Sequence, residues 1–391
     1  MTRLSIREYA HAIQSRYLKA KKKEKTKILD EFTKTTGLHQ KAAIRLFNRI
    51  NKPQATRRPG RPRKYNNEVV RALKIVWEAG DRLCSKRLHP FLPEMVRVLR
   101  ENRENLITAE VESQLCRISP STIDRLLHPF RQQGGRRSFS TTKPGSLLKN
   151  SIPIRTFTDW QENRPGYLEA DTVAHCGGSV EGFYLNTLMA VDIASGWSEG
   201  NAVWGKSQER VGSAIHGLRQ RFPFPILGLD TDNGGEFINQ RLFNYCQREH
   251  ITFTRSRSYK KNDNCYVEQK NGNVVRRVIG YDRYSSRQAL ETLNQIYYLL
   301  HLYGNFFQPT MKLLSKSRHG AKVHKVYDTA QTPYQRLLTL DVLSGTKKQE
   351  LAATYSRLNP ARLLSQINQS LEHLWTIKER SIMPSHRINQ E

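Results

Sequence analysis

Two short apolar runs, each ending at a carboxylate, set the strongest limit on how this chain folds. The run at 225–229 leads into the segment DTDNGGEF, which contains Asp232, and the run at 166–170 leads into Asp171. A third acid, Glu268, comes later in the chain. Carboxylates at strand ends, beside a polar glycine turn, offer the oxygen ligands that hard divalent cations prefer. The three acids therefore predict an open metal site at the end of two strands.

The spacing of these acids resembles the D, D-x35-E signature of the retroviral-integrase-like transposases. Between Asp232 and Glu268 lie 35 residues. Asp232 stands in the sequence TDNG, with Phe237 shortly after it, and Asn271 follows Glu268. The resemblance covers residues 167–281, about a third of the chain.

The resemblance implies a ribonuclease-H-like core that cleaves and joins DNA, with Asp171, Asp232 and Glu268 as catalytic and metal-binding residues. Two Mg²⁺ or Mn²⁺ ions per active site would activate the nucleophile and stabilise the leaving oxygen of an in-line phosphodiester displacement. The leading hypothesis is a transposase of a bacterial insertion sequence. Its expected partners are double-stranded DNA, as element ends and as target, and further copies of itself, because two DNA ends need two active sites.

Two other functions remain open at the level of sequence. A ribonuclease-H-like nuclease without strand transfer would use the same acids, but two candidate DNA-binding modules before the core favour a transposase. A catalytically silent DNA-binding regulator derived from a transposase would be expected to lack one of the acids, and all three are present.

Other titratable residues lie close to the three acids in sequence. Asp230 and Glu169 each precede one of them by two residues and share its strand face, so they are rival ligands. Glu236 is interpreted as a turn residue and Asp192 as a structural acid of a hairpin. His175 has no visible partner and is interpreted as structural.

The charge balance also indicates nucleic acid. The chain has 64 Lys and Arg against 35 Asp and Glu, a formal net charge of +29. A polyanionic partner is expected, with a generally basic, ribosome-associated protein as the alternative. No apolar run is long enough for a membrane span and no signal peptide is recognised, so a cytoplasmic, nucleoid-associated protein without membrane contact is expected. Five cysteines without C-x-x-C spacing argue against zinc.

Basic residues are concentrated at the N-terminus, where residues 1–64 hold 19 Lys and Arg against 4 Asp and Glu. Two helical patterns on either side of a Thr-Thr-Gly-Leu break predict a helix-turn-helix domain over residues 1–51. Lys41, Arg45 and Arg49 are its candidate DNA contacts. An ordinary basic helical hairpin is the alternative.

The next segment, residues 52–65, is rich in proline and arginine and is predicted to be a linker. Its sequence GRPR resembles an AT-hook core, in which Arg61 and Arg63 would enter a narrow A·T minor groove. A plain solvated linker is the alternative.

A second helical domain is predicted for residues 66–132. Ser119 suits an N-cap and Pro120 the first helical position of a short helix there. That helix is typical of a second helix-turn-helix, with a purely structural helix as the alternative. Its candidate DNA contacts are Ser121, Thr122 and Arg125.

A linker at 133–151 precedes the catalytic core, predicted for 152–305 as a mixed five-stranded α/β sheet flanked by helices. The dipeptide Asn271-Gly272 would ordinarily predict a hairpin turn. The resemblance instead places a helix there, with Glu268 on its first turns. Basic and polar residues around it are candidate phosphate contacts: Lys260, Lys261, Lys270, Asn271, Arg276 and Arg277.

The rest of the chain, residues 306–391, is predicted to be basic and mostly helical. It carries no motif. The sequence therefore predicts a multidomain protein with all-α modules, an α/β core and a helical C-terminal region.

Overall fold

The computed structural model of the chain describes residues 1–49, 64–102, 107–131, 164–257 and 264–378. The chain divides into two compact units, Met1–Lys64 and Tyr65–Glu391. The candidate DNA contacts Arg61, Arg63, Lys260 and Lys261 lie outside the described residues, as does the linker at 133–151.

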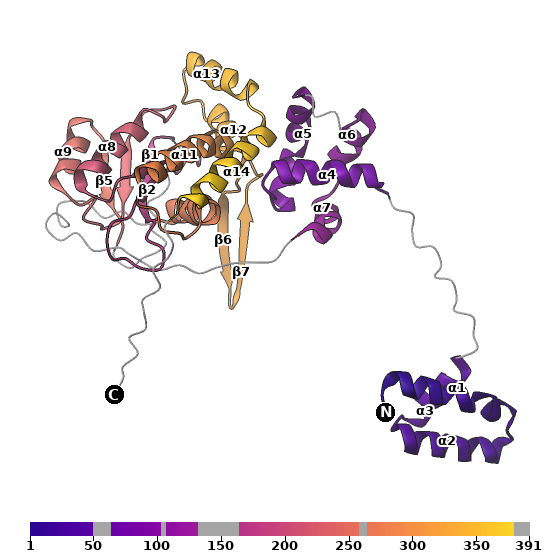
Figure 1. The fold of residues 1–391 in the computed structure, drawn as a ribbon. Helices are drawn as coiled ribbons and strands as arrows, with labels where there is room; N and C mark the ends of the chain where they lie inside the picture. Colours follow the sequence, from indigo (N-terminus) through magenta and orange to yellow (C-terminus); the bar gives the residue numbers. More distant parts are fainter. Residues whose placement is uncertain (50–63, 103–106, 132–163, 258–263, 379–391) are drawn as a thin grey trace, which may run out of the picture. The chain divides into compact units, whose positions relative to one another are not determined.

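The first unit is a three-helix module with its own small core (Figure 1). Its helices are α1 (Arg3–Lys19), α2 (Lys22–Thr36) and α3 (Gln40–Arg49). Gly37 ends α2 because it adopts the left-handed conformation, with φ at 71°. Phe32 of α2 packs on Phe47 of α3, with ring centroids 4.8 Å apart. This packing leaves Lys41 and Arg45 exposed on α3.

The second unit begins with a helical domain of four helices and a short 3-10 turn. They are α4 (Asn67–Ala79), α5 (Ser85–Glu101), α6 (Ala109–Cys116), α7 (Pro120–Leu127) and η1 (His128–Phe130). Helix α7 starts as the sequence predicts, because the Ser119 hydroxyl accepts the Thr122 N–H at 3.3 Å and Pro120 takes the first position. Ser121 and Arg125 are exposed on this helix.

The centre of the second unit is a five-stranded sheet in the order β3-β2-β1-β4-β5. Its strands are β1 (Tyr167–Ala174), β2 (Asn186–Asp192), β3 (Ser198–Val203), β4 (Gly228–Thr231) and β5 (Thr252–Arg255). The first three strands pair antiparallel, whereas β1, β4 and β5 run parallel. The predicted mixed sheet is therefore confirmed, and this strand order is that of the ribonuclease-H-like fold.

Helices cover both faces of the sheet. Helices α8 (Gln208–Arg219) and α9 (Gln240–Arg248) lie over one face, and α11 (Arg287–Phe307) packs on the other. The approach of α11 requires a glycine at 200, since a Cβ there would lie 2.8 Å from the Tyr297 ring.

The predicted helix after β5 is confirmed, and the alternative hairpin at Asn271-Gly272 is wrong. Helix α10 (Cys265–Lys270) continues without a break into the π-helix η3 (Asn271–Ile279). π-helical turns occur frequently at functional sites. Gly272 lies on the exposed side of this helix, and a side chain at that position would meet no neighbouring atom within 4 Å.

The C-terminal region is mostly helical, as predicted, but it also contains a two-stranded sheet that the sequence interpretation missed. Its elements are β6 (Leu313–His319), β7 (Lys322–Tyr327), α12 (Pro333–Thr339), α13 (Gly345–Ser356) and α14 (Pro360–Thr376). Helix α14 packs on α11 of the core.

Polar contacts tie the helical domain to the core within the second unit. The buried Tyr303 hydroxyl of α11 donates to the Ala79 carbonyl at 2.7 Å. Arg277 of η3 forms an ion pair with Asp81 at 2.9 Å. Asp81 and Arg82 both have positive φ, 51° and 57°, a strained turn that these contacts help to hold.

Across the parts of the chain that the structure describes, no helix combines the length and apolar character that a membrane crossing requires.

Candidate active site

The sheet topology brings Asp171 and Asp232 to neighbouring positions. Strands β1 and β4 are parallel neighbours, and Ala170 lies opposite Thr231. Asp171 follows Ala170 and Asp232 follows Thr231, so the backbones of the two acids lie side by side where the pairing of β1 with β4 ends. The structure thus brings Asp171 and Asp232 close together, but Asp171 lies inside β1 and not at its end as expected, because β1 stays paired with β2 as far as Ala174.

Gly234 allows the chain to turn tightly beside Asp232. The Asp232 carboxylate accepts the Gly234 N–H at 2.9 Å. A Cβ at Gly234 would lie 2.7 Å from the carboxyl group of Glu236 and 3.0 Å from Oδ1 of Asp232. The glycine therefore leaves room for two carboxylates to approach each other.

Glu236 is a member of the site that the sequence interpretation missed. Only 6% of this residue is exposed, and its carboxylate accepts the Thr172 hydroxyl at 3.0 Å. The Lys206 ammonium lies 3.7 Å from it. Glu236 lies in the turn, as expected, but its side chain points back toward Asp171 and Asp232. No local signal in the sequence marks this role, because the hydrogen-bond partner is Thr172, 64 positions away.

The electrostatics of the site show an excess of negative charge. Burial and the neighbouring charge of Asp232 raise the pKa of Asp171 to about 8. Burial and the charge of Glu236 raise the pKa of Asp232 to about 6. Crowded carboxylates of this kind are stabilised by a bound cation, which offsets their repulsion.

Glu268 is exposed on the short helix α10. Its negative charge contributes to the raised pKa values of Asp171 and Glu169. In the described part of the chain, no group of three His, Cys, Asp or Glu side chains is close enough to hold a metal ion. The donor set that faces the edge is nevertheless all oxygen, which fits Mg²⁺ or Mn²⁺.

Glu169 and Asp230 lie beneath the site and are buried. The Glu169 carboxylate accepts the Val267 N–H at 2.8 Å, which holds the first turn of α10 against β1. Asp230 accepts the Thr254 hydroxyl at 2.5 Å. The two acids were considered as rival metal ligands, but each of them accepts a hydrogen bond from another part of the protein instead.

Asn271 is the first residue of η3, and its side-chain amide donates to the Asp171 carboxylate at 2.8 Å. Asn271 is only 8% exposed. The residue was expected to contact DNA, but its side chain is turned inward to Asp171.

The other candidate phosphate contacts on this segment differ in accessibility. Lys270 is half-buried, and burial together with the Arg87 guanidinium lowers its pKa to about 8. The Arg276 guanidinium lies over the Tyr281 ring, 5.1 Å from its centroid. Arg277 is exposed but is engaged with Asp81 of the helical domain.

His175 has a partner that the sequence did not reveal. It is fully buried and its Nε2 lies 2.7 Å from the Thr187 hydroxyl. Burial and the charge of Arg276 lower the pKa of His175 to about 3, so the ring is neutral. Asp192 accepts the N–H groups of Gly166 and Ser195 at 2.8 and 2.7 Å, which is the structural role expected of it.

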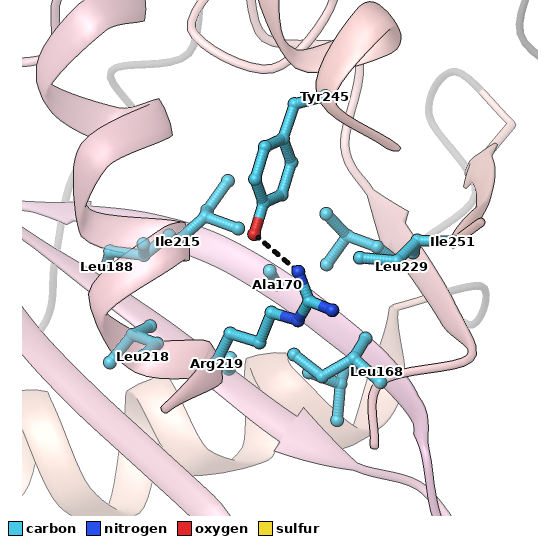
Figure 2. Close-up of a pocket in the computed structure, with 11 residues that line it drawn as sticks. Leu168, Ala170, Leu188, Ile215, Leu218, Arg219, Leu229, Tyr245 and Ile251 are labelled. Atoms are coloured by element: carbon cyan, nitrogen blue, oxygen red, sulfur yellow. Dashed lines mark hydrogen bonds between the residues drawn. The ribbon is translucent and has the colours of Figure 1, made fainter. Parts of the chain in front are cut away.

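The opposite face of the sheet carries a small apolar pocket (Figure 2). Leu168, Ala170 and Leu229 line it from the strands, and Arg219 donates to the Tyr245 hydroxyl at 3.4 Å beside it. Its volume is about 10 Å³, room for about one water molecule. Because side chains alternate along β1, Ala170 faces this pocket and Asp171 faces away from it. The pocket belongs to the packing of the core.

The strand order of the mixed sheet and the helices on both of its faces define a ribonuclease-H-like fold. No known protein-family profile matches the chain. The chain is 40% identical over 331 residues to the uncharacterized protein y4rM of Sinorhizobium fredii (strain NBRC 101917 / NGR234). The matched residues cover 84% of this chain and 94% of y4rM. It belongs to the same family as y4rM.

Solved structures that are similar to the chain include three of viral integrases. The catalytic core domain of BIV integrase is 22% identical with a TM-score of 0.31, covering 44% of this chain and 94% of that one. The HTLV-2 integrase core in complex with magnesium is 16% identical with a TM-score of 0.29, covering 37% and 90%. A simian T-cell lymphotropic virus intasome in complex with PP2A regulatory subunit B56 gamma is 13% identical with a TM-score of 0.32, covering 61% and 73%.

Proposed function

We propose that this protein is a DDE-type transposase of a bacterial insertion sequence. It would bind the ends of a mobile DNA element and catalyse cleavage and strand transfer by in-line attack on a phosphodiester. The observation that carries the proposal is the meeting of Asp171 and Asp232 where the parallel pairing of β1 with β4 ends. Glu268 lies on α10, which runs directly into Asn271, a hydrogen-bond donor to Asp171. The D, D-x35-E spacing supports the same assignment.

The proposed ligands of two Mg²⁺ or Mn²⁺ ions are Asp171, Asp232 and Glu268. The crowded, partly protonated carboxylates support this assignment, since a cation would relieve their repulsion. When bound, the ions would activate the attacking water or 3′-hydroxyl and stabilise the leaving oxygen.

The residues around the acids would orient them for this chemistry. The Asn271 amide fixes one oxygen of Asp171, and the Gly234 N–H fixes one oxygen of Asp232. Glu169 holds the N-terminal turn of α10 through the Val267 N–H, and so sets the position of Glu268. Such supporting contacts commonly change metal affinity or activity 10- to 100-fold when they are lost.

Recognition of the element ends would fall to the helical modules. On α3 the candidate contacts are Lys41, Arg45 and Arg49, and on α7 they are Ser121, Thr122 and Arg125. The net charge of +29 and the exposure of Lys41, Arg45, Ser121 and Arg125 support this division. Assembly as a homodimer or larger multimer on DNA in the bacterial cytoplasm completes the proposal.

The test is a strand-transfer assay with candidate element-end DNA in Mg²⁺ or Mn²⁺. Glu268→Gln keeps the shape of the side chain and removes its charge, and Glu372→Gln, an exposed acid of α14, is the matched control. The expected result is joined product from the wild type and from the control, and none from Glu268→Gln, with DNA binding intact in all three.

Other outcomes separate the alternatives. DNA cutting without joining by the wild type would favour a ribonuclease-H-like nuclease. DNA binding without any cutting would favour a regulator. Joining that survives Glu268→Gln would remove Glu268 from the site.

A further inference from the structure

The hairpin formed by β6 and β7 is exposed along its whole length. The two strands form a sheet of their own, separate from the sheet of the core. Figure 1 shows the two arrows, in orange, standing clear of α12 and α14. A lone two-stranded hairpin is only marginally stable in water, so its persistence calls for support from its base or from a partner.

The base of the hairpin is firmly held. The Lys312 N–H donates to the Asp328 carboxylate at 2.6 Å, and the Asp328 N–H donates back to the Lys312 carbonyl at 3.0 Å. Arg336 donates to the same carboxylate at 2.6 Å, and the Lys312 ammonium reaches the Ile193 carbonyl at 2.6 Å. The two strands therefore leave the body of the second unit in a fixed direction.

The strands carry a concentrated positive charge. Residues 312–327 contain five Lys and Arg, two His and no Asp or Glu. Lys316 lies directly opposite Lys325, and like charges in that position destabilise a sheet. Because side chains alternate along a strand, Arg318 shares their face. No described carboxylate forms an ion pair with any of these three cations.

Large apolar side chains are also exposed on the hairpin. Leu314 is 66% exposed, and Val323, Val326 and Tyr327 are between 40% and 45% exposed. A surface that combines exposed apolar groups with unpaired cations is suited to a partner that presents both phosphates and apolar groups. Duplex DNA does so, and its major groove admits a two-stranded ribbon.

The base of the hairpin shares a pocket with the segment that follows Glu268. Tyr327, its last residue, lines the same pocket of about 350 Å³ as Gln269 and Lys270, the two residues that follow Glu268. A duplex that lay across the acids would therefore pass close to the root of the hairpin.

We propose that the β6–β7 hairpin is a DNA-binding ribbon that contacts the phosphates of a duplex through Lys316, Arg318 and Lys325. The proposal rests on the proposed function for the identity of the partner, and adds a third DNA-contacting surface to the two helical modules. It holds the duplex next to the catalytic edge of the sheet.

The test measures binding of the full chain to a labelled random-sequence DNA duplex in EDTA, over a series of salt concentrations. The hairpin variant is Lys316→Gln/Arg318→Gln/Lys325→Gln. Each phosphate contact contributes about 0.9 to the slope of log affinity against log salt. The variant is expected to lower the magnitude of that slope by about 2.7.

The matched control removes the same charge from residues elsewhere, of which Arg362 is exposed and Lys347 and Lys348 are partly exposed. It is Lys347→Gln/Lys348→Gln/Arg362→Gln on α13 and α14, where Lys347 and Lys348 already pair with acids. The control is expected to keep the wild-type slope within one unit. Circular dichroism and thermal unfolding of both variants verify that the fold is retained, as exposed positions allow.

The outcomes distinguish this proposal from the proposed function. If the hairpin variant keeps the wild-type salt slope, the hairpin does not bind DNA. The same holds if the control variant lowers the slope by as much as the hairpin variant does. A change in sedimentation of the hairpin variant with an unchanged slope assigns the hairpin to self-association and also overturns the proposal.

Asp171→Asn is included because it should abolish joining and keep the slope. If the hairpin variant lowers the salt slope but the wild type never joins DNA, the hairpin still binds DNA and the transposase assignment is wrong.

Discussion

The side-chain amide of Asn271 donates a hydrogen bond of 2.8 Å to the carboxylate of Asp171, across the contact between the π-helix and the first strand. This bond links the two elements that carry Asp171 and Glu268. The asparagine is buried, so its replacement leaves the molecular surface nearly unchanged.

Asn271→Ala should lower strand transfer by roughly 10- to 100-fold, as is usual when a group that orients a metal ligand is lost. The loss should shrink when Mg²⁺ or Mn²⁺ is raised, because the acids remain. Asn273→Ala, an exposed residue on the same helix, is the control and should keep wild-type activity. Equal activity of the two variants would show that the bond to Asp171 is not used.

Gly234→Ala should disturb the site by a steric effect alone. The new methyl group would lie 2.7 Å from the Glu236 carboxyl group, which must move. A clash of this kind costs about 1–3 kcal/mol when the surroundings cannot adjust. We expect a clear loss of strand transfer with little change in thermal unfolding temperature, since the turn is at the edge of the core.

The double variant Gly234→Ala/Glu236→Ala tests the cause of that loss. Removing the Glu236 carboxyl group relieves the closest contact of the new methyl group and leaves the one at 3.0 Å to Oδ1 of Asp232. Adding Gly234→Ala should therefore cost less activity in the Glu236→Ala protein than in the wild type. An equal loss in both would assign the effect of Gly234 to the contact with Asp232 or to the backbone instead.

The sequence predicted the elements that depend on local pattern. Apolar runs of strand length gave the five strands, and Ser119-Pro120 gave the start of α7, because capping is a local interaction. The strand-end pattern placed Asp232 correctly after β4, but Asp171 lies inside β1, and it comes beside Asp232 because the parallel register sets Ala170 opposite Thr231. Asn271-Gly272 is the exception, where local preference predicts a hairpin and tertiary packing against β1 yields a helix.

The features that the sequence did not predict depend on distant contacts. Glu236 joins the site through Thr172, a residue 64 positions away, so its role is not visible in the turn. The partner of His175 is Thr187 on the neighbouring strand. The β6–β7 hairpin has no buried face, so its strands lack the alternation of apolar and polar residues that marks an ordinary strand.

His175 should make the protein sensitive to acid. Its folded-state pKa is about 3 against an ordinary value of 6.5, so the unfolded chain binds a proton that the folded chain does not. The resulting contribution to stability is fully present above pH 6.5 and is lost as pH falls toward 3. The slope is at most about 1.4 kcal/mol per pH unit.

His175→Gln isolates this contribution from that of the buried acids. Urea unfolding at pH 6.5 and pH 5 should show the wild type losing up to about 2 kcal/mol more than the variant over that interval. The raised pKa values of Glu169 and Asp171 act in the opposite direction, but they are present in both proteins. Parallel pH profiles for the two proteins would mean that folding does not lower the pKa of His175.

Tyr303 should anchor the helical domain to the core. Its hydroxyl is buried and donates to the Ala79 carbonyl at 2.7 Å, next to the strained turn at Asp81 and Arg82. Tyr303→Phe removes the donor and leaves the carbonyl without it, which should cost about 1–3 kcal/mol of unfolding free energy. It should also speed proteolysis at that turn, because one of the contacts that hold it is gone.

Tyr298→Phe, on the same helix but 58% exposed, is the matched control and should change neither the unfolding free energy nor the rate of proteolysis. If Tyr303→Phe unfolds like the wild type and its turn resists protease equally, the hydrogen bond does not couple the two parts of the unit.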